Sequence, residues 1–393
     1  MNRFPPPPSK YSSAARSIVN NVGVGVGAVF LLGFPIRRAL PAPVVTIHPQ
    51  SHTASAGASV VFATAADGME IAYQWRKNGV AIAGAIDPIL VLNNVQPGDA
   101  GTYDVLVTNA DASIESRPET LAIAGGGGTS HLANVSVRAN LDANRTLIVG
   151  FAVSGGHKPL LVRAVGPGLQ PYLPAGVNFA ADPRLELYDA ASVAVNANDN
   201  WSSDGSAKQQ ALADAMAIVG AFPLPGNSLD AALISETEGP NTVHARVTAP
   251  GLGLVEAYDT GSDSVGRLVN VSARYAVGSG DGALIAGFVV EGAVSTTLLI
   301  RGIGPELATF GVADALANPR IEVFNAAQQK VAENDDWTPA LALAFTQVGA
   351  FPLMPGSADA ASLVTLAPGS YTAVLSGAGG TTGEGLVEVY EMP

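Results

Sequence analysis

An internal duplication constrains the fold of this chain more than any other feature. Residues 132–259 and 268–391 carry seven short blocks in the same order, so one module occurs twice. The paired blocks are LANVSVR with LVNVSAR, LIVGFAVSG with LIAGFVVEG, LLVRAVGPGL with LLIRGIGPEL, DPRLELYDA with NPRIEVFNA, NDNW with NDDW, VGAFPL with VGAFPL, and LVEAY with LVEVY. Length differences gather between the blocks, as expected of surface loops. Both copies must therefore reach the same fold.

The repeated blocks alternate apolar and polar residues with the period of a β-strand. In RLELYDA, Leu185 and Leu187 face one way while Glu186 and Tyr188 face the other. Glycine (44 residues) and proline (27) are abundant and only 13% of residues are charged, which disfavours long surface helices. The sequence therefore predicts an all-β fold in which each copy is a β-sandwich or jelly-roll-like module, with one short helix before each GAFPL block.

Residues 44–124 carry a different set of motifs. Trp75 lies at the centre of YQWRKNG. Further along, Asp99, Gly101 and Tyr103 form a D-x-G-x-Y pattern. This segment resembles the immunoglobulin fold, in which a buried tryptophan packs between two sheets and a tyrosine near the start of a late strand forms a tyrosine corner. The resemblance implies an immunoglobulin-like domain with Trp75 in its core and the Tyr103 hydroxyl bonded to nearby backbone.

The immunoglobulin-like segment departs from its family at the two cysteine positions, which Thr64 and Val105 occupy. The whole chain lacks cysteine, which excludes disulfides, thiolate zinc sites and cysteine nucleophiles. The core must therefore hold its two sheets together without a covalent bridge. Because glycine-rich residues 125–131 form a linker after this segment, and residues 260–267 form one between the copies, we expect the three modules to melt separately.

The two copies resemble a repeat that accompanies immunoglobulin-like modules in exported proteins of environmental bacteria of the verrucomicrobial type. The shared marks are LI-x-GF, R-x-x-GP, ND-x-W, GAFPL and LVE-x-Y. A weaker similarity, in LYDA, NDNW and PGSYTAVLSG, is to bacterial pre-peptidase C-terminal domains. Those are accessory β-sandwiches, some of which bind calcium. Neither resemblance implies a catalytic activity.

The N-terminal segment, residues 1–43, has the composition of a targeting signal. Lys10 and Arg16 precede an uncharged run, Ser17–Ile36, with an apolar centre. A cleaved secretory signal and an uncleaved membrane anchor both fit this pattern, and a folded segment is the third interpretation. Either export interpretation places the body outside the cytoplasm, at the cell surface or beyond it, with membrane contact only through this segment.

The ND-x-W block supplies the best ligand candidates, because it groups oxygen-bearing side chains after a strand. The six candidate calcium ligands are Asn198, Asp199 and Asn200 in the first copy and Asn334, Asp335 and Asp336 in the second. Two interpretations remain open: a turn whose side chains bond to their own backbone, or a calcium site. Any calcium site with so few carboxylates should be weak, at about 10⁻⁴–10⁻³ M.

Other repeated charged residues favour structural roles. Because residues i and i+2 share a strand face, Arg184 should pair with Glu186, and Arg320 with Glu322. The repeated residues Arg163, Arg301, Asp230 and Asp359 are expected to form internal ion pairs or backbone caps. Binding of a carboxylate or a sugar is the alternative for the arginines, and a cation site or a buried hydrogen-bonded carboxylate is the alternative for the aspartates.

Charge and motifs exclude several functions. The net charge of the chain is −13. Without residues 1–43 the chain has 15 basic and 33 acidic residues, so it repels phosphate groups and nucleic acid is an unfavourable partner. Asp259 begins a D-T-G-S sequence, but no second such motif provides the partner carboxylate of an aspartic protease. Zinc-hydrolase, P-loop and dinucleotide motifs are lacking in the sequence. The sequence predicts a non-catalytic secreted or surface protein that binds a glycan or an extracellular protein. A hydrolase-associated accessory module, an enzyme with a site between the copies, and a structural spacer are the alternatives.

Overall fold

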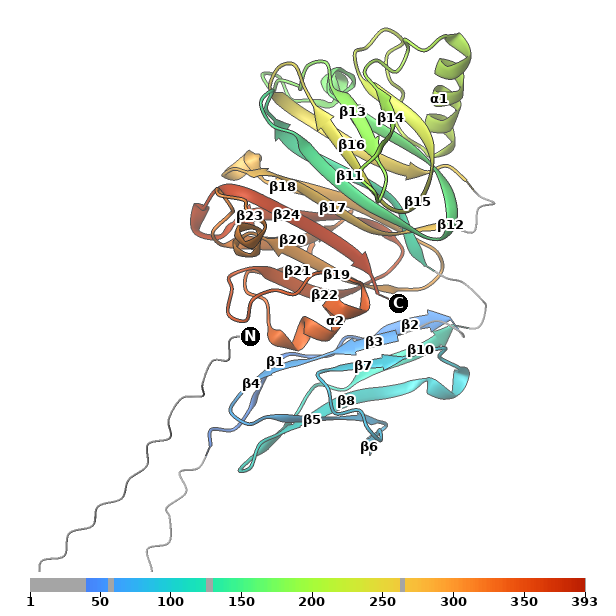
Figure 1. Ribbon diagram of the computed structural model, residues 1–393. Helices are drawn as coiled ribbons and strands as arrows, with labels where there is room; N and C mark the ends of the chain where they lie inside the picture. Colours follow the sequence, from blue (N-terminus) through green and yellow to red (C-terminus); the bar gives the residue numbers. More distant parts are fainter. Residues whose placement is uncertain (1–39, 56–59, 125–129, 262–265, 393) are drawn as a thin grey trace, which may run out of the picture. The chain divides into compact units, whose positions relative to one another are not determined.

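The computed structural model describes residues 40–55, 60–124, 130–261 and 266–392 (Figure 1). The chain divides into two units, Met1–Ala39 and Leu40–Pro393, and all that follows concerns the second. The predicted targeting segment lies outside the described residues except for 40–43, as do 125–129 and 262–265 of the two linkers. Among the described residues, no helix has the length and apolarity to cross a membrane.

The first part of the unit is an immunoglobulin-like sandwich. Its main sheet has the order β2-β10-β8-β5-β6, with β9 beside β8, and it faces the pairs β3–β7 and β1–β4. The strands are β1 (Val44–Ile47), β2 (His52–Ser55), β3 (Val60–Ala63), β4 (Ala65–Asp67), β5 (Ala72–Lys77), β6 (Val80–Ala81), β7 (Ile89–Leu92), β8 (Gly101–Thr108), β9 (Ser113–Glu115) and β10 (Glu119–Ala124). The prediction of an immunoglobulin-like, all-β fold is confirmed.

Aromatic packing holds this sandwich together. Trp75 on β5 is fully buried, and its indole Nε1 donates to the carbonyl of Asp87 at 2.9 Å. The Tyr103 hydroxyl donates to the carbonyl of Asp99 at 2.8 Å, which is the contact of a tyrosine corner. Phe62 stacks on Tyr103 with 4.8 Å between ring centroids. Burial of its ring raises the pKa of Tyr103 to about 12.

The two positions that hold cysteines in the family are both buried here. The Thr64 hydroxyl donates to the carbonyl of Ile47 at 2.9 Å, so this polar side chain is satisfied inside the module. Val105 packs in the same apolar cluster as Trp75. Close packing and a side-chain hydrogen bond therefore take the place of a disulfide bridge.

The two repeats contain the same elements in the same order. The first copy has β11 (His131–Leu141), β12 (Leu147–Val165), β13 (Arg184–Tyr188), β14 (Ala194–Asn198), α1 (Ser206–Ile218), β15 (Ala231–Arg246) and β16 (Gly251–Asp259). The second has β17 (Arg267–Val277), β18 (Leu284–Glu291), β19 (Thr296–Ile303), β20 (Pro319–Asn325), β21 (Lys330–Asn334), α2 (Ala342–Gln347), β22 (Ala360–Leu366), β23 (Gly369–Gly377) and β24 (Gly383–Glu391). The long strands β12 and β15 of the first copy thus correspond to two strands each in the second.

The first strand of each repeat pairs with a strand of the other repeat as well as with one of its own. β11 lies between β16 of its own copy and β18 of the second copy, while β17 lies between β24 and β12. Following the pairs gives sheet A, of order β14-β13-β15-β12-β17-β24-β19-β22, and sheet B, of order β21-β20-β23-β18-β11-β16-β12-β15. The long strands β12 and β15 take part in both sheets.

One apolar core fills the space between sheets A and B. Buried residues from strands of both copies belong to a single cluster, including Val149, Phe151, Val271 and Phe288. The sequence led us to expect that the copies melt separately. Strands that pair across the copies and a core that they share argue against this expectation, because neither copy can unfold without exposing the other. We expect one cooperative transition for residues 130–392.

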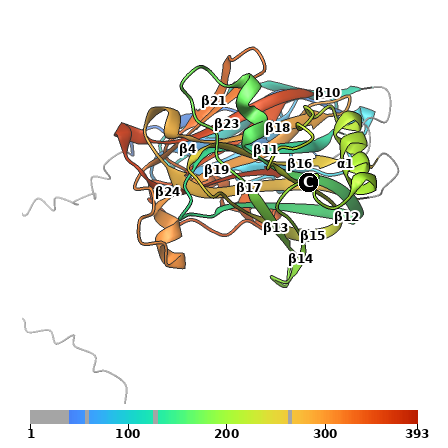
Figure 2. The ribbon, with the colours of Figure 1, turned by 90° about the horizontal axis from the view of Figure 1, so that it is seen from above.

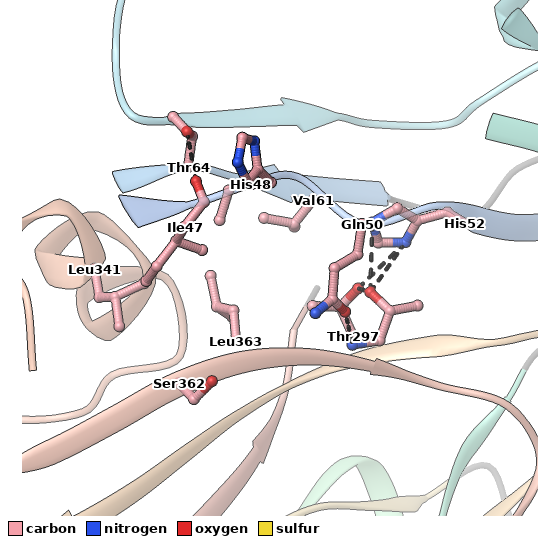
Figure 3. A pocket seen from close by; sticks show the side chains of 12 residues that line it. Ile47, His48, Gln50, His52, Val61, Thr64, Thr297, Leu341, Ser362 and Leu363 are labelled. Carbon is pink, nitrogen blue, oxygen red and sulfur yellow. Dashed lines mark hydrogen bonds between the residues drawn. The ribbon is translucent and has the colours of Figure 1, made fainter. Parts of the chain in front are cut away.

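The immunoglobulin-like module also packs on the second copy. Val61 and Ile89, on the outer face of β3–β7, belong to one apolar cluster with Leu299 and Tyr390. Figure 3 shows the cavity left at this contact, which has a volume of about 30 Å³. Such a void has room for about one water molecule and is too small for an organic ligand. The contact is therefore structural, and it couples this module to the repeats.

His52 makes the contact with the second copy sensitive to acid. Its ring lies 3.4 Å from the Thr297 hydroxyl and is almost fully buried, and burial lowers the pKa of His52 to about 4 (Figure 3). The unfolded chain takes up the proton near pH 6.5, so stability is fully present above that pH and is lost as pH falls towards 4. The shift corresponds to about 3 kcal/mol in total.

We expect the urea midpoint of the chain to fall more steeply between pH 7 and pH 4 than that of His52→Gln. Glu391, whose pKa burial raises to about 7, contributes a slope of opposite sign, because its stabilisation is lost as pH rises through that value. This contribution is common to both proteins and cancels in the difference. Parallel curves for the two proteins would show that His52 is not the acid-sensitive group.

Both helices cover equivalent parts of the sandwich. Leu212 and Met216 of α1 pack on Leu161 of β12 in sheet B, and Phe345 of α2 packs on Leu299 of β19 in sheet A. In Figures 1 and 2 α1 lies along one side of the first copy's strands. The outer face of β13, β15, β12 and β17 in sheet A, and that of β20, β23, β18 and β11 in sheet B, carry no helix among the described residues.

Candidate functional site

The first asparagine of each ND-x-W block joins its loop to a neighbouring strand. In the first copy, Asn198 Oδ1 accepts the backbone N–H of Ala232 at 3.0 Å, and its Nδ2 donates to the carbonyl of Asn200 at 3.4 Å. In the second copy, Asn334 makes the same two contacts, with Ala361 and Asp336, at 2.8 and 2.9 Å. Bonds from side chain to backbone are what the turn interpretation predicts, and they explain why Asn occurs at this position in both copies.

The other candidate ligands lie close by but not in a cluster. Asp199, Asp335 and Asp336 are exposed. The Asn200 Oδ1 atom is buried and has no hydrogen-bond partner in the structure, so one acceptor in the first copy is open. In the part of the chain that the structure describes, no group of three or more His, Asp or Glu side chains is placed to hold a metal ion. Calcium binding here stays a prediction.

Calorimetric titration checks the calcium prediction directly. We expect weak binding, at about 10⁻⁴–10⁻³ M, that disappears in Asp199→Ala/Asp335→Ala. Asp214→Ala is a matched control, since Asp214 is an exposed carboxylate on α1 that is bonded to Gln210. If the unchanged chain gives neither calcium-dependent heat nor a rise in melting temperature, the turn interpretation alone remains.

Asp230 and Asp359 fix the turn that follows each repeated arginine. Asp230 is fully buried and accepts the backbone N–H groups of Gly166 and Gly168 at 2.8 and 2.9 Å. Asp359 accepts the N–H of Gly304 at 2.7 Å in the same way. The carbonyls of the two aspartates also accept the N–H groups of the two ND-x-W tryptophans, Trp201 and Trp337. The backbone-cap interpretation of these aspartates therefore has a geometric basis.

Several motif blocks meet at a buried arginine in each copy. Arg163 is fully buried and contacts Glu256 at 2.5 Å, the carbonyl of Phe222 at 2.7 Å, and the face of the Phe222 ring. The Tyr258 hydroxyl donates to the second oxygen of Glu256 at 2.8 Å. Burial, followed by the Glu256 charge, raises the pKa of Tyr258. R-x-x-GP, GAFPL and LVE-x-Y are thus parts of one cluster.

The second copy repeats this cluster with corresponding residues. Arg301 donates to Glu388 at 2.8 Å and to the carbonyl of Phe351 at 2.6 Å, and the Tyr390 hydroxyl donates to Glu388 at 2.8 Å. An ion pair of this kind satisfies both charges inside the protein. Because its polar atoms are out of reach of solvent, we assign the cluster a structural role. The ion-pair expectation for these arginines did not name their partners, which lie 93 and 87 residues away.

The pairs on strand faces lie as the i, i+2 spacing predicts. Arg184 contacts Glu186 at 3.1 Å, and Arg320 contacts Glu322 at 3.3 Å. Glu186 also forms an ion pair of 3.1 Å with Arg246 on the adjacent strand β15. Hydrogen bonding from the Tyr188 hydroxyl is the main reason that the pKa of Glu186 is lowered. The first pair therefore belongs to a larger polar network on sheet A.

Asp259 of the D-T-G-S sequence takes part in an ion pair. Its carboxylate lies 2.6 Å from Lys158 Nζ and accepts the N–H of Gly261 at 3.0 Å. Such contacts hold the end of β16 to the bend of β12. These contacts give Asp259 a structural role at the end of β16.

The uncovered face of sheet A carries a hollow lined by cations. Three arginines from three different segments, Arg145, Arg246 and Arg274, surround Ile148 and His244. Ile148 is paired with Arg274 on one side and with His244 on the other. The hollow has a volume of about 290 Å³ and is also lined by Thr146 and Glu384. No sequence motif pointed to it, because strand pairing alone brings these residues together.

Beside the hollow, each uncovered face has a row of small residues that ends in an aromatic ring. On sheet A the row across the strands is Ser272, Gly150, Thr242 and Tyr188. On sheet B the corresponding row is Ser136, Gly287, Thr372 and Phe324. No bulky side chain stands in the middle of either row, and the aromatic ring at its end offers an apolar surface with a defined geometry.

Comparisons with known proteins add little to these observations. No family model matches the chain, and no curated protein matches it. A solved structure of tandem Ig repeats of Dlar is 24% identical over 21% of this chain and 50% of that one, with a TM-score of 0.21. A structure of the four N-terminal Ig domains of Dscam1 isoform 4.44 is 29% identical over 22% of this chain and 21% of that one, with a TM-score of 0.20.

A chimeric titin Z1Z2 structure is 20% identical over 23% of this chain and all of that one, with a TM-score of 0.20. This chain thus spans half of the Dlar structure and about a fifth of the Dscam1 structure. Likenesses at such TM-scores carry no argument about function, and the resemblance of the repeats to bacterial families has no support from a family model or a curated sequence. What the strand order does show is an all-β protein with an immunoglobulin-like module.

Proposed function

We propose that this chain is a non-catalytic, exported binding protein whose binding surface is the uncovered face of sheet A. The observation that carries the proposal is that only part of sheet A is covered by other elements. β19 and β24 are covered by α2 and its loops, whereas β13, β15, β12 and β17 present their outer side chains. Function is argued from this surface, because the fold alone supports many activities.

The chemistry of the uncovered face suits a glycan or the surface of an extracellular protein. It combines a row of small residues, the Tyr188 ring and exposed charged groups. Tyr188 packs against His244 with 4.6 Å between ring centroids, which gives an aromatic platform. Export is supported by the composition of residues 1–43 and by the resemblance of the repeats to those of exported bacterial proteins.

An enzyme with a site between the copies is the second candidate. The strongest ionisable clusters among the described residues are Arg163 with Glu256 and Arg301 with Glu388, and both are buried and symmetric. A catalytic site needs accessible groups that the substrate can reach. The pairs therefore favour a scaffold, and binding is the better-supported function.

A binding screen of the secreted chain against glycans and extracellular matrix proteins, with calcium and with a chelator, tests the proposal. We expect hits of micromolar to millimolar affinity that do not require a chemical change in the ligand. Intact-mass analysis of the secreted form should show the loss of about the first 42 residues if the signal is cleaved. A clean failure across the screen would leave the spacer role in its place.

A further inference from the structure

The hollow on sheet A is a cationic site in an acidic protein. Outside residues 1–43 the chain has 15 basic and 33 acidic residues, yet three arginines line this one cavity. The side chains of Arg145, Arg246 and Arg274 are 43%, 53% and 39% exposed, so solvent and ligands reach them. Glu384 lines the hollow as well, and each arginine contacts a carboxylate, so the attraction for an anion depends on the guanidinium groups that these contacts leave open.

The arginines have donors to spare. Arg246 uses Nε on the Thr146 hydroxyl at 3.0 Å and Nη1 on Glu186 at 3.1 Å. The buried Arg274 Nε atom makes an ion-pair contact of 3.4 Å with Glu384 that lacks hydrogen-bond geometry. The two Nη groups of Arg274 make no hydrogen bond among the described residues, so they are the donors that a ligand oxygen can use.

Two of the arginines act on His244, which also lines the hollow. The pKa of His244 is lowered, first by burial and next by the charge of Arg246, with Arg274 acting in the same direction. Glu186 opposes this effect but does not reverse it. His244 is therefore held towards its neutral form, and the arginines carry the positive charges of the hollow.

The two copies differ at the residues that line the hollow, which shows whether the fold itself requires those residues. By strand register, Arg274 corresponds to Arg138 on sheet B, because each pairs with an isoleucine of the next strand. The same register matches His244 with Val374 and Arg246 with Ser376. Sheet B folds with one of these arginines, so the added cations on sheet A are not required to form such a sheet.

We propose that this hollow binds the carboxylate of a uronic-acid-containing polysaccharide, an assignment that rests on the binding function proposed above. A guanidinium holds a carboxylate with two parallel hydrogen bonds, and Arg246 and Arg274 supply two such groups. Glu186 and Glu384 accept hydrogen bonds from sugar hydroxyls, and the Tyr188–His244 pair lies next to the hollow for ring packing.

A peptide fits this place less well than a sugar chain. The backbones of β15, β12 and β17 are paired on both sides at the hollow, so an extended peptide has no free strand edge to join. A sugar chain needs no such edge and lies across side chains on a sheet face. We therefore assign the site to an acidic glycan, with acidic peptide as the competing outcome of the test.

Calorimetric titration of the full chain with polygalacturonate oligomers tests the assignment. The matched probe is the methyl-esterified oligomer, which keeps the sugar and removes the charge, and poly-glutamate is the peptide probe. We expect binding to the acid form only, with weakening by added salt. Arg246→Gln and Arg274→Gln should each lower affinity by roughly 10-fold. Arg138→Gln, at the equivalent place on sheet B, should leave it unchanged.

Each other outcome has a definite meaning. Unchanged polygalacturonate affinity in Arg246→Gln/Arg274→Gln, with an unaltered melting temperature, overturns the assignment of the site. Equal or tighter binding of poly-glutamate overturns the assignment to a sugar. If the chain binds neutral glycans or matrix proteins but no polygalacturonate, this inference fails while the proposed binding function stands. If it binds none of them, both fail.

Discussion

Arg301→Met should lower the free energy of unfolding by about 3–5 kcal/mol, because it leaves Glu388 charged and unpaired inside the protein. Arg301 is fully buried and Glu388 is 4% exposed, so water cannot replace the lost guanidinium. The change also removes the donor to the carbonyl of Phe351. Urea unfolding followed by circular dichroism measures the loss.

Two further variants show that the unpaired charge causes the loss. Arg301→Met/Glu388→Gln should recover most of the stability, since a neutral amide costs less to bury and still accepts from Tyr390. Arg320→Met breaks a partly exposed pair with Glu322 and should cost at most about 1 kcal/mol. A loss for Arg301→Met no larger than that for Arg320→Met would contradict a structural role for the buried cluster.

Trp75→Ala should destabilise the immunoglobulin-like module by about 3–5 kcal/mol, the range for a large aromatic side chain removed from a core. Trp75 is fully buried among Phe62, Val105 and Tyr103 in a module without a disulfide. Trp75→Phe keeps much of the packing and loses the bond to the Asp87 carbonyl, so it should cost less. Scanning calorimetry measures both variants.

Because the immunoglobulin-like module contacts the second copy, the Trp75→Ala experiment also tests whether the module stabilises the repeats. Val61 and Ile89 are buried on the second copy, so unfolding of the first module exposes part of that copy. We expect the melting temperature of the repeats to fall as well, with the fluorescence of Trp201 and Trp337, the two tryptophans left in the variant, as the probe. If the repeats melt at an unchanged temperature, the modules are independent, as the sequence first indicated.

Local patterns allowed much of the fold to be predicted. The Trp75 and D-x-G-x-Y patterns act within one module, and the i, i+2 pairing of Arg184 with Glu186 follows from strand geometry alone. Alternation places Phe62 in its own core, but it does not show that Val61 on the other face is also buried. That burial depends on the second copy, which lies more than 200 residues further along the chain.

The exchange of first strands and the cationic hollow could not be predicted for a related reason. An alternating pattern shows which face of β11 or β17 is apolar and says nothing about which strand lies beside it. Arg145, Arg246 and Arg274 come together only when β12 pairs with both β15 and β17. The duplication predicted two equal folds, whereas the site lies where the copies differ.

The binding screen carried out on three forms of the chain tests the central claim most directly. Thr242→Glu places a bulky negative group in the row of small residues on sheet A, and Thr372→Glu places the same group at the equivalent position of sheet B. We expect the ligands of the unchanged chain to be lost with Thr242→Glu and kept with Thr372→Glu. Ligands that bind Thr242→Glu as well as the unchanged chain would contradict a binding surface on sheet A.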